Sequence, residues 1–147
     1  MKPKVVIRRM TLADLDAVQK IERTVFTDPW SRESYRYEIR QNRFSFPVVL
    51  EVGGEVVGYA VAWRIYEEFH IANLAIAPEH QGKGWGKLLL NFLLEQAGGA
   101  KFALLEVRRS NRRAIRLYEK FGFQPFGVRP RYYHDQEDAL VMRKQLR

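Results

Sequence analysis

The sequence of 147 residues contains no cysteine. This absence excludes a disulfide framework, a thiolate metal site and a thiol nucleophile, and it is compatible with a reducing compartment. Long apolar runs are absent too. Only three consecutive apolar residues, Val5 to Ile7, precede two arginines near the amino terminus, which is too few for the core of a signal peptide. No run approaches the ~18 apolar residues that a membrane-spanning helix requires. We therefore expect a cytoplasmic protein with no membrane partner.

Acidic residues are fewer than basic ones. There are 17 Asp and Glu residues against 25 Lys and Arg residues, which gives a net charge of +8. Such an excess points to an anionic partner: nucleic acid, a phosphorylated cofactor or a ribonucleoprotein surface. The densest basic cluster comprises Arg108, Arg109, Arg112, Arg113 and Arg116. It can be a solvated helix face, or a surface that attracts cofactor phosphates or a protein surrounded by RNA, and the sequence leaves this open.

The length predicts a single domain over residues 1–147. Apolar periodicity and turn signals predict alternating strands and helices. The predicted strands are 5–7, 46–52, 56–65, 69–77, 101–107, 124–129 and 139–143, and the predicted helices are 11–25, 31–41, 87–97 and 111–121. This order implies an α/β (α+β) fold, in which a mixed central sheet is flanked by helices on both faces. The central strands are almost continuously apolar, as expected for strands that are covered on both sides.

Residues 80–94, HQGKGWGKLLLNFLL, place three glycines and two lysines directly ahead of an apolar helix. The stretch is neither a P-loop nor a dinucleotide-binding fingerprint. Leu88 stands where the P-loop needs Ser or Thr, and no third glycine falls at the required spacing. Glycine backbone at a helix amino terminus can nevertheless direct several N–H groups at one anion, such as a pyrophosphate. The alternative for this stretch alone is a mobile glycine-rich turn.

Two further residues are candidates for chemistry. Strand alternation in the segment 102–107 puts Glu106 on the same face as Phe102 and Leu104, where a carboxylate must be paired, hydrated or part of a site. A salt bridge to an arginine is the simpler interpretation. Tyr118 lies in the middle of the apolar arc of the helix 111–121, where most tyrosines are core residues with a satisfied hydroxyl.

Several motifs resemble those of the Gcn5-related N-acetyltransferase (GNAT) superfamily, and a second set resembles its bacterial RimI-type subgroup, the ribosomal-protein alanine N-acetyltransferases. The first set is Ala75-Ile-Ala-Pro78 leading into Gln81-Gly-Lys-Gly-Trp-Gly86, and the second is Leu105-Glu-Val-Arg-x-Ser-Asn111 with Ala114-Ile-x-Leu-Tyr118-Glu-x-x-Gly122-Phe123. The resemblance spans essentially the whole chain. One departure is Gly82, where many relatives carry arginine.

The resemblance implies the GNAT fold and acetyl-CoA as cosubstrate. We expect no metal, because His70, His80 and His134 lie at no metal-ligand spacing. It assigns Glu106 as the general base, acting through water, and Tyr118 as the general acid for the CoA thiolate. The implied cofactor-binding residues are Leu74, Ala75, Ile76, Gln81, Gly82, Lys83, Gly84, Trp85, Gly86, Lys87, Asn111 and Tyr118. Asn111 is also expected to cap its helix. Trp30, Tyr132 and Tyr133 are the expected walls of a peptide pocket.

The implied reaction is acetylation of a protein N-terminus, most specifically the N-terminal alanine of small-subunit ribosomal protein eighteen. Other protein N-termini, a lysine or a small-molecule amine remain open as acceptors. A basic nucleic-acid-binding module is a remote alternative, with no direct nucleic-acid function expected. Such a module interleaves aromatic and basic residues on one strand face, whereas most aromatic residues here fall in apolar runs.

Overall fold

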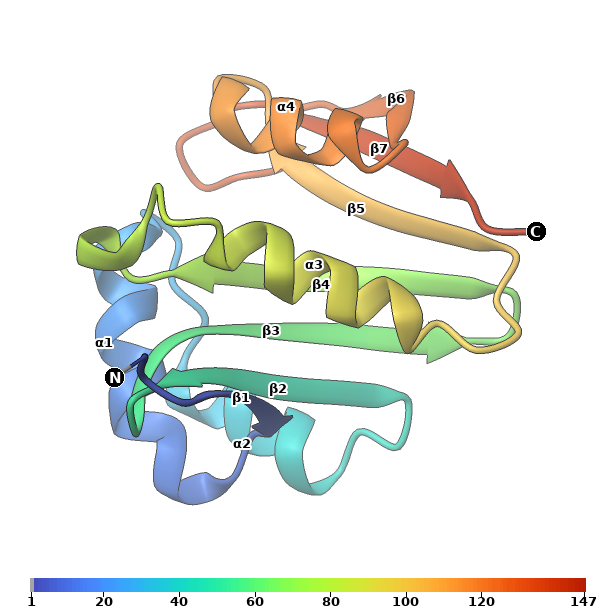
Figure 1. The fold of residues 1–147 in the computed structure, drawn as a ribbon. Helices are drawn as coiled ribbons and strands as arrows, with labels where there is room; N and C mark the ends of the chain where they lie inside the picture. Colours follow the sequence, from blue (N-terminus) through green and yellow to red (C-terminus); the bar gives the residue numbers. More distant parts are fainter. Residues whose placement is uncertain (1) are drawn as a thin grey trace.

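A computed structural model describes residues 2–147, and its elements follow the predicted order (Figure 1). The strands are β1 Val5–Arg9, β2 Ser45–Val52, β3 Glu55–Ile65, β4 Glu68–Ile76, β5 Phe102–Arg108, β6 Gln124–Arg129 and β7 Ala139–Gln145. The helices are α1 Leu15–Val25, α2 Arg32–Arg40, α3 Trp85–Glu95 and α4 Arg112–Lys120, with short 3-10 turns at Leu12–Asp14 and Pro78–His80. The predicted strands and helices are therefore confirmed, and most boundaries move by two residues or fewer.

The strands of residues 2–147 form one sheet in the order β1-β2-β3-β4-β5-β7-β6. Neighbouring strands are antiparallel except β4 and β5, which are parallel. Successive residues of β2 face opposite sides. Val48 and Leu50 pack with α3 and α4, whereas Val49 packs with α1 and α2. Both faces of the central strands are therefore covered, as their apolar sequences predict.

The start of the first helix differs from the prediction. Residues Leu12–Asp14 form a 3-10 turn before α1 begins at Leu15. The Asp14 carboxylate accepts hydrogen bonds from the Thr11 N–H at 2.8 Å and from both terminal nitrogens of Arg8 at 2.8 Å. The Arg8 hydrogen bonds lower the pKa of Asp14, and they do so against the effect of burial. Asp14 therefore joins β1 to α1.

The parallel pair opens a crevice in the sheet. Strands β4 and β5 pair only from Glu68–Ile71 to Phe102–Leu105, and beyond this point they diverge (Figure 1). The register of β3 and β4 shifts beside Ala72, because Val61 pairs with Asn73 and Ala62 with Ile71. Ligands of open sheets bind in crevices at the carboxyl ends of parallel strands. No helix within residues 2–147 has the length and apolar character to cross a membrane.

Candidate active site

A cavity of about 1080 Å³ occupies the crevice between β4 and β5. All the predicted site residues except Lys83 line it: Trp30, Leu74, Ala75, Ile76, Gln81, Gly82, Gly84, Trp85, Gly86, Lys87, Glu106, Asn111, Tyr118, Tyr132 and Tyr133. They come from the α1–α2 segment, β4, the glycine loop (residues 81–84), the start of α3, β5, α4 with its cap, and the β6–β7 loop. The fold thus brings together residues from distant parts of the chain, from Trp30 to Tyr133.

The glycine loop forms one end of this cavity. Gly82 has φ 80° and Gly84, which caps α3, has φ 88°; both values lie in the left-handed region that favours glycine. The Gln81 side chain donates to the Ile76 carbonyl at 2.9 Å and so ties the loop to the end of β4. The unpaired N–H groups at the start of α3 point out of the helix beside Lys87, a donor set that suits a phosphate or pyrophosphate.

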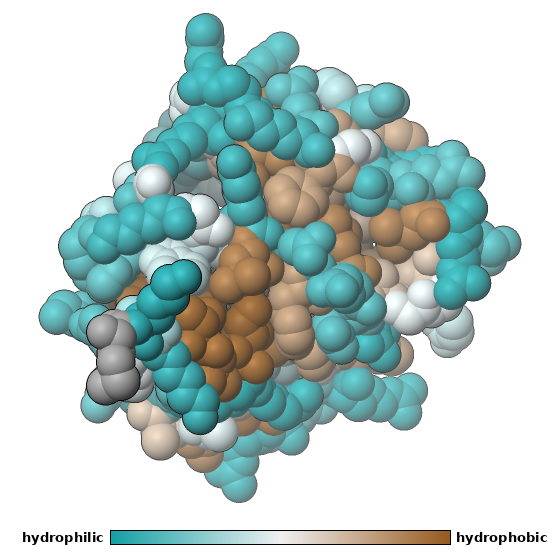
Figure 2. All heavy atoms as spheres, viewed as in Figure 1, coloured by the Kyte–Doolittle hydropathy of each residue, from teal (hydrophilic) through white to brown (hydrophobic). Residues whose placement is uncertain are grey.

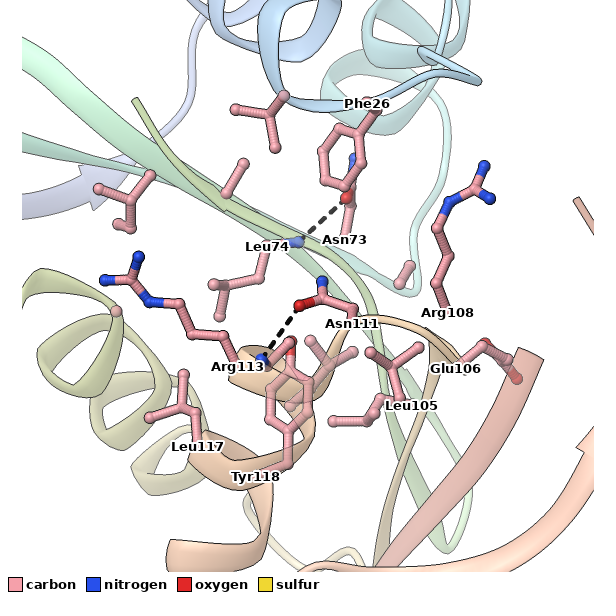
Figure 3. A pocket seen from close by; sticks show the side chains of 18 of the residues that line it. Phe26, Asn73, Leu74, Leu105, Glu106, Arg108, Asn111, Arg113, Leu117 and Tyr118 are labelled. Carbon is pink, nitrogen blue, oxygen red and sulfur yellow. Dashed lines mark hydrogen bonds between the residues drawn. The ribbon is translucent and has the colours of Figure 1, made fainter. Parts of the chain in front are cut away.

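Strand β4 supplies the wall next to the loop. The resemblance implies that Leu74, Ala75 and Ile76 of this strand bind the cofactor. The Leu74 N–H donates to the Asn73 side-chain oxygen at 3.1 Å (Figure 3), so this donor already has an acceptor within its own strand. The Asn73 amide in turn donates to Glu22 at 3.0 Å. Asn73 thereby links the shifted register of β4 to α1.

Glu106 lies on β5 and faces the cavity, with 11% of its side chain exposed. Its Oε1 atom is 2.7 Å from His70 Nε2, and its Oε2 atom is 3.4 Å from Arg129 Nε. Burial favours the neutral acid, but the hydrogen bond and charge of His70 together with Arg129 outweigh it, so the pKa of Glu106 is lower than usual. Glu106 therefore forms the ion pair that the simpler interpretation predicts, and it also lines the cavity.

Tyr118 and Asn111 are carried by α4 (Figure 3). Burial raises the pKa of Tyr118 to about 12, so its hydroxyl keeps its proton throughout the neutral range. The ring packs edge-on against Phe123, with centroids 5.9 Å apart. Asn111 accepts the Ala114 N–H at 3.2 Å, which confirms the predicted helix cap. Its side-chain nitrogen is the group left to face the cavity.

Aromatic side chains surround the opposite end of the cavity. Trp30 stacks on Trp63 with ring centroids 6.5 Å apart, and Tyr132 meets Tyr133 edge-to-face at 5.1 Å. The Arg108 guanidinium lies 4.1 Å from the centroid of the Tyr133 ring. At this end of the cavity the walls are therefore aromatic rings, and their hydroxyl and N–H groups are the polar atoms.

Arg108 joins the two segments that border that end. Its guanidinium contacts Thr27 at 2.7 Å and Asp28 at 3.5 Å, both from the α1–α2 segment. It also contacts Asp135 and Glu137 of the β6–β7 loop, each at 2.9 Å. The His134 N–H donates directly to Asp28 at 2.9 Å. The two segments are thus held together by charge-assisted hydrogen bonds.

Sequence reasoning alone did not single out several polar residues that line this cavity, among them Glu22, His70 and Asn73, and it named Arg108 only as part of the basic cluster. His70 and Glu106 lie 36 positions apart, and only the parallel pairing of β4 with β5 places them side by side. The pattern of the helical segment 11–25 gives no sign that Glu22 is buried. Within residues 2–147, no group of three or more His, Asp or Glu residues gathers as a metal-ligand set.

A profile of the Acetyltransferase (GNAT) family matches residues 15–123. A Bacillus subtilis (strain 168) relative, provisionally named a ribosomal protein bS18-alanine N-acetyltransferase, is 41% identical over 145 residues, which cover 97% of this chain and 96% of the relative. The crystal structure of the ribosomal-protein-S18-alanine N-acetyltransferase from Escherichia coli has a TM-score of 0.88 and 31% identity, covering 97% of this chain and 94% of that one.

A provisionally named acetyltransferase from Salmonella typhimurium, solved with its cofactor acetyl-CoA, has a TM-score of 0.79 and 26% identity, covering 97% of this chain and 94% of that chain. These similarities extend over nearly the full length of the chain. They confirm the resemblance that the motifs indicated and the fold that it implied. The chain belongs to the Acetyltransferase (GNAT) family.

Proposed function

We propose that this protein transfers the acetyl group of acetyl-CoA to the N-terminal α-amine of a protein, and that its acceptor is the N-terminal alanine of ribosomal protein bS18. The names of the Bacillus subtilis and Escherichia coli relatives support the acceptor. The observation that carries the proposal is the convergence of the Glu106 carboxylate, the Tyr118 hydroxyl and the glycine loop on one cavity.

The residues that line the cavity suit acetyl-CoA. Gly82 and Gly84 bring main-chain N–H groups close to an anion at the mouth of α3, and Lys87 adds a positive charge there. The same cavity between the diverging strands is lined by this loop, by Glu106 and by Tyr118. When bound, acetyl-CoA supplies a thioester whose carbonyl carbon accepts a neutral amine.

Glu106 suits an α-amine better than a lysine. Its low pKa makes it a weak base, so the acceptor must lose its proton readily. At pH 7.5 an α-amine of pKa ~7.8 is neutral in roughly a third of molecules, and a lysine of pKa ~10.4 in roughly a thousandth. This difference favours the α-amine by about 250-fold. We propose that Glu106 takes the ammonium proton through water, while His70 holds its Oε1 atom.

Tyr118 acts at the sulfur side of the reaction. Its pKa of about 12 lies well above the ~8.5 of a thiol, so the hydroxyl keeps its proton before the bond breaks. We propose that it donates a hydrogen bond that strengthens as negative charge develops on the sulfur. Preorganised donors aimed at developing charge give the largest stabilisation when water is excluded, and burial of Tyr118 meets that condition.

The test is steady-state acetylation of a peptide that copies the bS18 N-terminus, with acetyl-CoA and mass-spectrometric detection. Glu106→Gln is expected to lower kcat/KM by about 100-fold or more, and Tyr118→Phe by about 10- to 100-fold. Glu119→Gln, on the exposed face of α4, serves as the matched carboxylate control. Wild-type rates in both site variants would remove these two residues from the proposal, and no acetylation by wild type would remove the reaction.

A further inference from the structure

The basic cluster that the sequence left open divides into two groups in the structure. Arg108 and Arg109 are paired with carboxylates of the β6–β7 loop and its neighbourhood. Within residues 2–147 no ion pair reaches Arg112, Arg113, Arg116 or Lys120 of α4. The helix therefore presents positive charge that has no carboxylate partner in this part of the chain.

Three of these cations face the cavity. Arg113, Arg116 and Lys120 line it, whereas Arg112 does not. Their spacing of i, i+3 and i+7 places them in one stripe along α4. Figure 2 shows mostly hydrophilic side chains over the region where Figure 1 places this helix. We name Arg113, Arg116 and Lys120 the α4 stripe.

The near end of the α4 stripe touches the glycine loop. A Cβ atom added to Gly82 would lie 3.6 Å from Arg113 Nη2, and one added to Gly86 would lie 3.7 Å from Leu117 Cδ2. Figure 3 shows the Arg113 guanidinium on the side of the cavity opposite Arg108. The stripe thus begins at the loop that we assign to the pyrophosphate and runs away from the acceptor end.

The α4 stripe is also longer than the region that one pyrophosphate would contact. A helix rises 1.5 Å per residue, so Lys120 lies roughly 10 Å along the axis from Arg113. The loop N–H groups, the α3 amino terminus and Lys87 already serve one diphosphate. Cations farther along the same cavity suit a second, separate anion, and a phosphomonoester carries about −1.5 to −2 charge at pH 7.

We propose that the α4 stripe is a phosphomonoester subsite, and that it binds the 3′-phosphate on the ribose of acetyl-CoA. This inference rests on the proposed use of acetyl-CoA. Arg113 lies where it can serve both phosphate groups, while Arg116 and Lys120 serve the 3′-phosphate. The subsite makes the protein discriminate CoA from 3′-dephospho-CoA.

The experiment is calorimetric titration of the full chain with CoA and with 3′-dephospho-CoA. Wild type is expected to bind CoA about tenfold more tightly than 3′-dephospho-CoA, because the 3′-phosphate adds one or two charge-assisted contacts at an exposed site. The double variant Arg116→Gln/Lys120→Gln should lose that preference by binding CoA about tenfold more weakly, with 3′-dephospho-CoA unchanged within twofold. Arg112→Gln, on the same helix but outside the cavity, should leave both affinities unchanged.

Two results would overturn the subsite while leaving the proposed function intact. One is wild type binding both ligands equally. The other is a double variant that weakens both ligands by the same factor, which would indicate general attraction to the diphosphate. Wild type binding neither ligand would instead overturn the use of acetyl-CoA, and the subsite with it. Raising the salt concentration should reduce the preference of wild type for CoA over 3′-dephospho-CoA, because salt screens exposed charges.

Discussion

Replacing Glu22 with glutamine tests the central polar network of the fold. Glu22 is buried, with 1% of its surface exposed to solvent. It accepts hydrogen bonds from the Tyr35 hydroxyl at 2.6 Å, the Tyr59 hydroxyl at 2.5 Å, the Asn73 amide at 3.0 Å and the Trp30 N–H at 2.9 Å. Burial raises the pKa of both tyrosines well above the usual range, so both hydroxyls remain donors. One carboxylate thereby holds α1, α2, β3 and β4 together.

The size of the effect follows from this geometry. A glutamine removes the charge from four hydrogen bonds, each weakened by roughly 1 kcal/mol, and it turns one acceptor into a donor that faces donors. Relief of the desolvation of a buried carboxylate offsets part of this loss. We expect a net destabilisation of about 3 kcal/mol, which lowers the Tm of a chain of this size by about 9 °C.

The assay is thermal unfolding at pH 7.5 followed by far-UV circular dichroism, with urea unfolding as a second measure of the free energy. Glu119→Gln is the control, because an exposed carboxylate should change stability by less than ~0.5 kcal/mol. A Tm for Glu22→Gln within about 2 °C of wild type would refute the reasoning, since the four donors would then need no charged acceptor.

Two further predictions concern other charged residues. Arg108→Gln should raise the KM of the acceptor peptide about tenfold and leave the KM of acetyl-CoA within twofold, because Arg108 joins only the two segments at the acceptor end. Steady-state kinetics measures both KM values, and Arg109→Gln is the control. An equal rise in both KM values would contradict the assignment. Asp14→Asn should reduce the free energy of unfolding by about 1 kcal/mol at pH 6, a value discounted because Arg8 is partly exposed. The pKa of Asp14 is lowered in the folded state, so its stabilisation is present above the unfolded pKa of ~3.9 and disappears as the pH falls through the folded value. Urea unfolding from pH 6 to pH 3 should therefore show a shrinking difference in the free energy of unfolding between wild type and Asp14→Asn. A constant difference would argue against the ion pair.

Local chemistry made much of this fold predictable. Ser31 and Asn111 cap α2 and α4 by accepting hydrogen bonds from the Ser34 and Ala114 N–H groups, and the Asn111 cap is the expected one. The paired glycines Gly53 and Gly54 form the turn between β2 and β3. Each of these signals acts within a few residues, and so the sequence carries it directly.

The rest depends on contacts between distant segments. The divergence of β4 from β5 creates the cavity, yet no short stretch of sequence encodes where two parallel strands stop pairing. The parallel pairing of β4 with β5 places His70 beside Glu106, and the packing of α1 on the sheet buries Glu22. Which arginines of the cluster form ion pairs likewise depends on where the β6–β7 loop returns, since its carboxylates contact Arg108 and Arg109.

The most direct test of the account uses one peptide that carries both a free N-terminal alanine and an internal lysine. Incubation with the protein and acetyl-CoA, followed by tandem mass spectrometry, locates each acetyl group. We predict acetylation at the α-amine at least ~100-fold faster than at the lysine at pH 7.5, because the Glu106 base is weak. Acetylation of the lysine at a comparable or higher rate would contradict the N-terminal assignment.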